Sequence, residues 1–309
     1  MGRRNRKGDP VHGWFVIDKP EGITSTKTVA IIKKLANAKK AGHGGTLDPL
    51  ATGILPIALG EATKTVPYIV DRKKEYEFTV EWGRASTTDD REGCITATSD
   101  IRPDRRAIER LIPNFTGLIE QIPPAFSAIK VGGERAYDLA RKGKTFDIPS
   151  RNIRIYDLAL LGIPDCDHAL FRVVSGAGAY MRALARDLAI ALGTVGHLTQ
   201  LRRTRVGPFS LDNGISLDEL KEFGHIAAVL EYLLPVETAL DDIPALALTG
   251  AEASKLRHGQ AVTLLRKGDI ERVIDLSDGA TVLATNQGKP LALAEFNAGK
   301  VRPFKVLKL

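Results

Sequence analysis

The chain of 309 residues has only two cysteines, Cys94 and Cys166, and no long apolar run. The cysteines form no Cys-x-x-Cys pair and have no neighbouring pair of histidines, so neither a disulfide framework nor a zinc site is indicated. No stretch of about 18 apolar residues is available to span a bilayer. The first residues, MGRRNRKGDP, lack the apolar segment of a secretory signal. These absences predict a soluble, cytoplasmic protein with no membrane segment.

The chain also lacks a complete glycine fingerprint for a dinucleotide. Gly176-Ala177-Gly178 matches the start of Gly-x-Gly-x-x-Gly, but Met181 occupies the position of the third glycine. The segment from Glu75 to Trp82 points away from a nucleotide-binding fold as well. It alternates aromatic and aliphatic residues with acids or Thr, a pattern typical of an antiparallel strand with one face exposed to solvent. A doubly wound parallel sheet is therefore disfavoured.

Negative charge is in deficit: 44 Lys and Arg oppose 37 Asp and Glu, for a net charge of +7. This balance indicates a polyanionic partner, of which nucleic acid is the commonest in the cytoplasm. Basic clusters occur in residues 1–12, predicted to form a flexible N-terminal arm, and at 135–144, 151–154 and 202–205. A single cluster is typical of a solvated face. Several spread along the chain favour a folded RNA that touches more than one surface.

Asp48 lies in a segment without any nearby cation. No Lys or Arg occurs within seven residues of it on either side, and glycines and Pro49 surround it. Asp-Pro is an ordinary turn signal, so a simple turn is the alternative to a catalytic carboxylate. Glycine lets the backbone approach a ligand closely, and proline fixes the chain direction after the acid. Any cation that keeps Asp48 ionised must come from a distant part of the sequence.

Arg182 is the candidate for that cation. It falls in the first turn of a helix predicted after Ala179, where a positive charge opposes the helix dipole by about 0.3–1 kcal/mol. A carboxylate partner compensates for this cost, and Asp48 and Asp90 are the candidates. The alternative is an ordinary surface arginine.

The remaining pattern predicts a series of short elements. We expect strands at 14–17, 75–82 and 170–174, and helices from a cap at Ser25 or Thr26 to Leu35, at 107–112 and at 135–142. Beyond residue 245, strand-like runs at 273–276, 281–284 and 291–296 alternate with Gly-bearing turns. This last region predicts a small β-rich domain.

Several segments occur in a fixed order along the chain: Asp18-Lys19-Pro20, GHGGTLDPLATG at 42–53, Lys74-Glu75-Tyr76, Thr88-Asp89-Asp90, PPAFSAIKVGGERAYDLARKG at 123–143, GAYMRALARDL at 178–188 and Leu201-Arg202-Arg203. This ordered set resembles the bacterial tRNA pseudouridine-55 synthases, the TruB family, over roughly residues 14–210. The resemblance is specific because every segment matches in sequence order.

The resemblance implies a catalytic group of three residues, Asp48, Tyr76 and Arg182, with Asp90 in a supporting role. Asp48 matches the nucleophile that helps to detach uracil from its ribose, after which the base rotates and rejoins through carbon five. Tyr76 matches a tyrosine that stacks on the flipped base and assists proton removal, although its position among apolar residues is also typical of core. Arg182 matches the arginine that pairs with the aspartate, and Asp90 the acid that holds this arginine. Neither a metal nor an organic cofactor takes part.

Three further positions have implied substrate-binding roles, and a fourth has a supporting one. His43 matches a histidine that contacts the T-loop, Tyr180 a tyrosine of the base pocket, and Leu201 an apolar residue against the base. Lys19 matches a lysine near the active site with a mainly structural role.

The chain departs from the family at Gly44, Ala177 and Ala179, where Thr, Lys and Thr are common. These changes affect binding contacts, and they remove no catalytic group.

The resemblance also implies the fold and the partner. We expect an α+β fold of the pseudouridine-synthase type, with a mixed, mainly antiparallel sheet and flanking helices. Residues 13–240 form the catalytic domain, in which an insertion at about 125–150 grips the tRNA T-arm, and residues 245–309 form a PUA-like RNA-binding domain. The partner is tRNA, no obligate protein partner is expected, and the chain is expected to be a monomer. A tRNA-folding chaperone and a guide-dependent synthase with partner proteins are the alternatives.

Overall fold

The computed structural model describes residues 8–127, 129–143, 145–264 and 267–309. Residues 1–7 of the predicted N-terminal arm and Lys144 of the predicted basic cluster lie outside the described residues. Across the described ranges, no helix is both long and apolar enough to cross a membrane.

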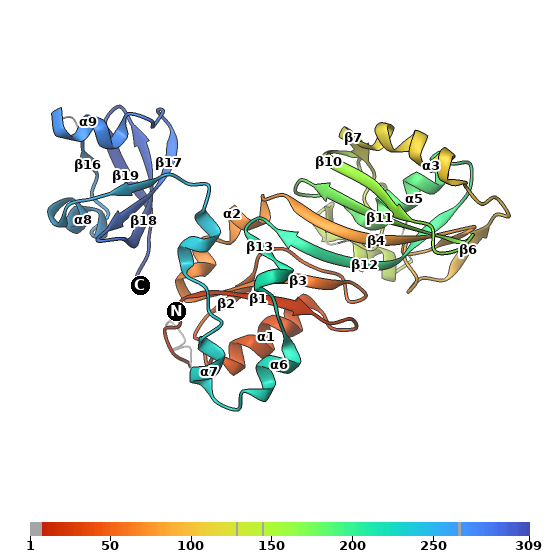
Figure 1. The fold of residues 1–309 in the computed structure, drawn as a ribbon, viewed down its shortest axis with the longest axis horizontal. Helices are drawn as coiled ribbons and strands as arrows, with labels where there is room; N and C mark the ends of the chain where they lie inside the picture. Colours follow the sequence, from red (N-terminus) through yellow and green to blue (C-terminus); the bar gives the residue numbers. More distant parts are fainter. Residues whose placement is uncertain (1–7, 128, 144, 265–266) are drawn as a thin grey trace.

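A mixed sheet of ten strands, counted over the described residues, forms the body of the molecule (Figure 1). The strands lie in the order β14-β1-β3-β12-β4-β11-β10-β7, with β2 beside β3 and β13 beside β12. The pairs β1–β14 and β3–β12 are parallel, and the others are antiparallel. The bounds are β1 Gly13–Lys19, β2 Ala41–His43, β3 Thr52–Leu59, β4 Lys74–Trp82, β7 Gly117–Gln121, β10 Arg151–Gly162, β11 His168–Ser175, β12 Gly196–Val206, β13 Phe209–Ser210 and β14 Ile215–Ser216. The predicted mixed, mainly antiparallel sheet is confirmed.

Strand β4 lies between β12 and β11 inside the sheet, and its sequence alternates between apolar and polar residues. Phe78, Val80 and Trp82 on one face are almost fully buried, while the acids on the other face remain partly exposed. The Phe78 ring stacks on Phe171 of β11, with 5.3 Å between the ring centres. Helix α5 (Met181–Ala191) adds its buried leucines to the same hydrophobic cluster. The apolar face of the sheet therefore lies under α5.

Helix α1 (Ser25–Leu35) starts at a cap that the sequence pattern misplaces. The N-cap is Thr24, whose hydroxyl accepts a hydrogen bond from the Lys27 N–H at 3.1 Å. The expectation that Ser25 or Thr26 caps this helix is wrong. The Ser25 side chain is buried instead and bonds to the loop that carries Asp48.

A five-stranded sheet in the order β15-β17-β18-β19-β16 contains the described C-terminal strands. Its elements are β15 Ala245–Ala247, α8 Gly250–Arg257, β16 Val262–Thr263, α9 Lys267–Val273, β17 Ala280–Asn286, β18 Lys289–Asn297 and β19 Lys300–Val306. The predicted strands at 281–284 and 291–296 are confirmed within β17 and β18. The predicted strand at 273–276 is wrong because helix α9 reaches Val273, and an ion pair one helical turn apart, Arg272 to Asp269, favours the helix.

Shorter elements connect these parts. They are α2 Val66–Val70, β5 Arg84–Ser86, β6 Ile95–Thr98, α3 Arg105–Leu111, β8 Lys130–Val131, β9 Glu134–Arg135, α4 Ala136–Arg141, α6 Leu217–Glu222 and α7 Ile226–Leu230, with 3-10 turns at Gly60–Lys64, Ile112–Phe115, Leu211–Asn213 and Val236–Leu240. The predicted helices near 107–112 and 135–142 correspond to α3 and α4. The hairpin β8–β9 and α4 lie in the segment predicted to be an insertion.

Candidate active site

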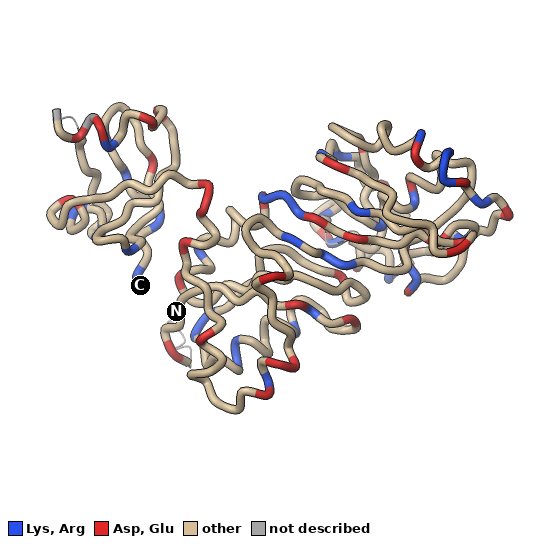
Figure 2. Tube along the Cα trace, viewed as in Figure 1, with Lys and Arg blue, Asp and Glu red and all other residues tan. Residues whose placement is uncertain are grey.

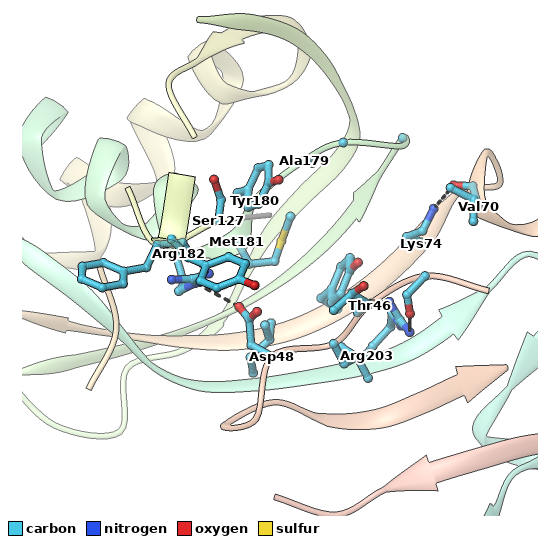
Figure 3. A pocket seen from close by; sticks show the side chains of 18 residues that line it. Thr46, Asp48, Val70, Lys74, Ser127, Ala179, Tyr180, Met181, Arg182 and Arg203 are labelled. Carbon is cyan, nitrogen blue, oxygen red and sulfur yellow. Dashed lines mark hydrogen bonds and ion pairs between the residues drawn. The ribbon is translucent and has the colours of Figure 1, made fainter. Parts of the chain in front are cut away.

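A pocket of about 480 Å³ lies where the Asp48 loop, the start of α5 and the segment before α4 meet over strands β4 and β12 (Figure 3). Its volume is typical of sites for small ligands. Its lining includes five predicted site residues: Asp48, Tyr76, Tyr180, Arg182 and Leu201. Segments that are more than 130 residues apart in sequence, at Asp48 and at Arg182, thus share one pocket.

Asp48 is paired with Arg182, as its isolation from local cations predicts. The Nε atom of Arg182 lies 2.9 Å from Oδ2 of Asp48 (Figure 3). The Asp48 side chain is 36% exposed, whereas that of Arg182 is only 7% exposed. The carboxylate therefore faces the pocket and the arginine supports it from the protein side. A pre-oriented anion of this kind is suited to nucleophilic or acid–base chemistry.

The Arg182 guanidinium is held on every side. One Nη1 contact, at 3.5 Å, reaches Oδ2 of Asp90, whose side chain is only 4% exposed. The same nitrogen donates to the Thr88 carbonyl at 3.0 Å, and Nη2 donates to the Phe126 carbonyl at 2.9 Å. A buried ion pair is stable only when its hydrogen-bonding capacity is met. These contacts fix the arginine, so the position of Asp48 is fixed as well.

The loop around Asp48 is anchored by two buried side chains. The Ser25 hydroxyl donates to the Leu47 carbonyl and accepts from the Leu47 N–H, both at 2.9 Å. The Lys19 ammonium is fully buried and donates to the carbonyl groups of Pro20, Ile23 and Pro49 at 2.8–3.2 Å. Burial lowers the pKa of Lys19 to about 8, and the negative charge of Asp48 opposes that shift.

Two cations that the sequence reasoning missed form the pocket floor. Arg203 is 1% exposed and donates to the carbonyl groups of Ile54, Thr46 and Gly45. Lys74 is 8% exposed, and burial, followed by the nearby Arg203 charge, lowers its pKa to about 8. Both positions have a sequence signal. Residues two apart in a strand point to the same face of the sheet. Lys74 therefore shares a face with Tyr76, and Arg203 with Leu201, which places both cations on the face that lines the pocket.

The opposite wall contains Tyr180 and Ser127, whose side chains lie close together (Figure 3). Burial raises the pKa of the Tyr180 phenol, so this group is neutral near pH 7. Tyr180 ends the turn that precedes α5, and the Gln121 amide binds both of its backbone polar groups.

Three predicted site residues lie outside the set that lines the pocket. Asp90 and Lys19 act on it through Arg182 and through the Asp48 loop, as described above. His43 lies at the end of β2, where burial and the charge of Arg203 lower its pKa. Its Nδ1 atom is buried and has no hydrogen-bond partner among the described residues.

No group of three or more His, Cys, Asp or Glu side chains within the described ranges is arranged to hold a metal ion.

Comparison with known proteins identifies first the fold and then the family. A chain in the crystal structure of a Cbf5–Nop10–Gar1 complex matches with a TM-score of 0.70 and 28% identity, covering 96% of this chain and 84% of that one. The fold is that of the pseudouridine synthases. Family models match residues 33–181, described as the TruB family pseudouridylate synthase N-terminal domain, and residues 182–241, described as the tRNA pseudouridylate synthase B C-terminal domain.

Full-length relatives agree with these models. Proteins named tRNA pseudouridine synthase B from Caulobacter vibrioides and Rhodospirillum rubrum are each 53% identical, and the matches cover 99% of this chain and 99% of each relative. The chain belongs to the TruB family, a family of isomerases.

Proposed function

We propose that this enzyme converts uridine 55 in the T-loop of tRNA into pseudouridine, with Asp48 as its nucleophile and without a cofactor. The observation that carries the proposal is the partly exposed Asp48 carboxylate, held by the buried Arg182 in a pocket of about 480 Å³, large enough to admit a nucleobase. The relatives at 53% identity support the reaction class.

The reaction is an isomerisation in which atoms and electrons balance. The bond from C1′ of the ribose to N1 of uracil breaks, and a bond from C1′ to C5 forms after the base rotates. C5 loses its proton, and N1 gains one. Asp48 assists the departure of the base, and Arg182, 2.9 Å from Oδ2 of Asp48, orients the carboxylate. Tyr76 stacks on the base and assists removal of the C5 proton, while Leu201 packs against it.

A uridine inside a folded T-arm must leave its stack to reach Asp48, at a cost of a few kcal/mol. Stacking on an aromatic side chain returns about 1–3 kcal/mol per base. Phosphate contacts supply affinity that does not depend on sequence. Figure 2 shows Lys and Arg positions along β12 and at the start of β4, in the middle of the molecule. We propose that residues 125–150 grip the T-arm, with the N-terminal arm 1–12, His43 and a PUA-like domain at 245–309 as further contacts.

The test is the pseudouridine content of an unmodified tRNA transcript incubated with the purified chain alone. Asp48→Asn preserves the shape of the side chain but removes the nucleophile, so conversion is expected to vanish while tRNA binding persists. The matched control is Asp157→Asn, which removes one carboxylate from an exposed pair with Arg172. This control is expected to convert like the wild type. Conversion by Asp48→Asn would overturn the mechanism.

The same experiment separates the alternatives. Binding and annealing of tRNA without conversion by the wild type would favour a tRNA-folding chaperone. The similarity to a chain within a complex that contains Nop10 and Gar1 supports the second alternative, a guide-dependent synthase. Conversion by the chain alone, acting as a monomer in the cytoplasm, is our expectation. Conversion only after partner proteins and a guide RNA are added would favour that second alternative.

A further inference from the structure

Gln121 makes a closed pair of hydrogen bonds with the backbone of a single residue. Its Oε1 atom accepts from the Tyr180 N–H at 2.9 Å, and its Nε2 atom donates to the Tyr180 carbonyl at 3.1 Å. Gln121 ends strand β7 and is 2% exposed. A side-chain amide that binds both backbone polar groups of one partly buried residue replaces the pairing that a neighbouring strand would give.

This contact lies where the chain turns into the helix that carries Arg182. Tyr180 is the N-cap residue of α5, and its own side chain makes no capping hydrogen bond. The start of a helix without such a cap is prone to fray. Its carbonyl also accepts the Leu184 N–H at 3.0 Å, the first bond of the helix. Gln121 therefore holds the first turn of α5 from outside the helix.

The same segment also binds the Arg182 side chain. The Phe126 carbonyl, five residues after Gln121, accepts from Nη2 of Arg182 at 2.9 Å. Residues 121–126 thus fix both the backbone two residues before Arg182 and its guanidinium group. Arg182 meets Asp48 through its Nε atom, so a displaced first turn would move the contact with the carboxylate.

We propose that Gln121 is a positioning residue that sets the start of α5 so that Arg182 meets Asp48 in the geometry the reaction needs. It is not among the residues that line the pocket, and its side-chain hydrogen bonds go to Tyr180. This inference rests on the proposed function, because the geometry matters only if Asp48 performs the chemistry. A misplacement of about 1 Å at such a site lowers a rate about 100-fold.

The test uses two variants of the full chain with tRNA. Gln121→Met removes both hydrogen bonds and keeps the length of the side chain. Its kcat is expected to fall roughly 10- to 100-fold, while the Kd for tRNA stays within about twofold of the wild type, a shift equivalent to well under 1 kcal/mol. The control is Asp157→Asn, at an exposed position outside the pocket and outside the segments proposed to bind tRNA, which is expected to leave kcat unchanged.

The second variant, Gln121→Glu, adds a signature that general destabilisation would not produce. An ionised carboxylate accepts from the Tyr180 N–H but repels the Tyr180 carbonyl, whereas a protonated carboxyl group restores one acceptor and one donor. Its kcat relative to the wild type is therefore expected to rise as the pH falls toward about 5, where a buried glutamate becomes protonated. A ratio that stays flat with pH would overturn the proposal.

A structural readout makes the two proposals distinguishable. The Nε atom of Arg182 lies 2.9 Å from Oδ2 of Asp48, so its proton resonance is expected to be sharp and slow to exchange in the wild type and lost in Gln121→Met. If the wild type fails to form pseudouridine but this resonance is lost in the variant, the proposed function fails and the positioning role stands. An unchanged resonance together with an unchanged kcat would refute the positioning role.

Discussion

Each charge in the pocket is held by groups from a different part of the chain. Arg182 has two carboxylates and two carbonyl groups around it, while Asp48 has one oxygen near the arginine and a side chain that is 36% exposed. Removing one partner of a buried ion pair leaves the other uncompensated, which is costly. This asymmetry supports the proposal that Asp48 is the reactive member of the group and that Arg182 and Asp90 hold it in place.

Ser25 binds the loop that carries Asp48, whereas its neighbour Thr24 caps helix α1. Substituting each residue alone therefore tests separately the anchoring of the loop and the stability of the helix. Ser25→Ala leaves the N–H and carbonyl of Leu47 without their partner, and the free energy of unfolding is expected to fall by about 1–3 kcal/mol. Because Leu47 precedes Asp48, kcat is expected to fall as well. The measurements are urea unfolding and kcat at saturating tRNA.

Thr24→Ala is the matched control for this prediction. It removes the N-cap of α1, and a loss of about 1 kcal/mol is expected from the free energy of unfolding. The Asp48 loop keeps its bonds to Ser25, so kcat is expected to stay close to the wild type. If both variants lost kcat equally, the loop would depend on the whole helix and not on the Ser25 hydroxyl.

The sequence predicts part of this site for a physical reason. An acid without a local cation requires a distant one, and an arginine in the first turn of a helix requires an acid, so the contact of Arg182 with Asp48 is predictable. Arg203 was missed because a basic run reads as an RNA-facing surface, whereas its burial depends on the carbonyl groups that surround it. Such contacts join positions that no local pattern connects.

At the scale of the elements, strands β3 and β12 pack closely against each other at Gly53. These strands run in parallel, with Thr52 opposite Arg202 and Gly53 opposite Arg203. Gly53 has a φ of +98°, and a Cβ atom there would overlap the carbonyl oxygen of Arg203. Glycine is therefore required both by the backbone conformation and by the approach of the neighbouring strand. This approach brings the end of the Asp48 loop beside the pocket floor.

Gly53→Ala is expected to lower the free energy of unfolding by about 2–5 kcal/mol, because backbone strain and steric overlap add together. The matched control is Gly22→Ala. Gly22 has a φ of +79°, but a Cβ atom there meets no atom of the described residues within 4 Å. Only the strain remains, so about 1–2 kcal/mol is expected. Equal losses in thermal or urea unfolding would show that the close approach of β12 contributes nothing.

The sequence predicts elements whose apolar residues recur with a regular period, but it does not predict whether a short apolar run forms a strand or a helix. β4 alternates over its whole length and lies at the centre of the sheet as expected. The run at 273–276 is too short to separate strand from helix by period alone. Arg272 favours the helix in this segment, because its guanidinium group forms ion pairs with Glu252 of helix α8 and with Asp269. A contact between elements, which the local pattern does not contain, fixed the structure there.

At the scale of the whole molecule, the C-terminal region shares a hydrophobic cluster with the body. Leu283, Leu293 and Leu307 pack in one cluster with Trp14 and Phe209 of the large sheet. Polar contacts border this cluster: the Lys64 ammonium donates to the Val306 carbonyl at 2.7 Å, and the Lys308 N–H donates to Glu61 at 2.9 Å. Burial of apolar surface across this boundary couples the two parts energetically.

This coupling predicts that the wild type unfolds in a single thermal transition. Leu307→Asp places an unpaired charge in the shared cluster, where Leu307 is 4% exposed, and it is expected to split the transition in two. Leu309→Asp makes the same change two residues later, at a side chain that is 55% exposed, and is expected to leave one transition. Calorimetry of both variants measures the difference. Two transitions in the wild type would show that the body and residues 245–309 are stable independently, and that the shared cluster serves only to orient one against the other.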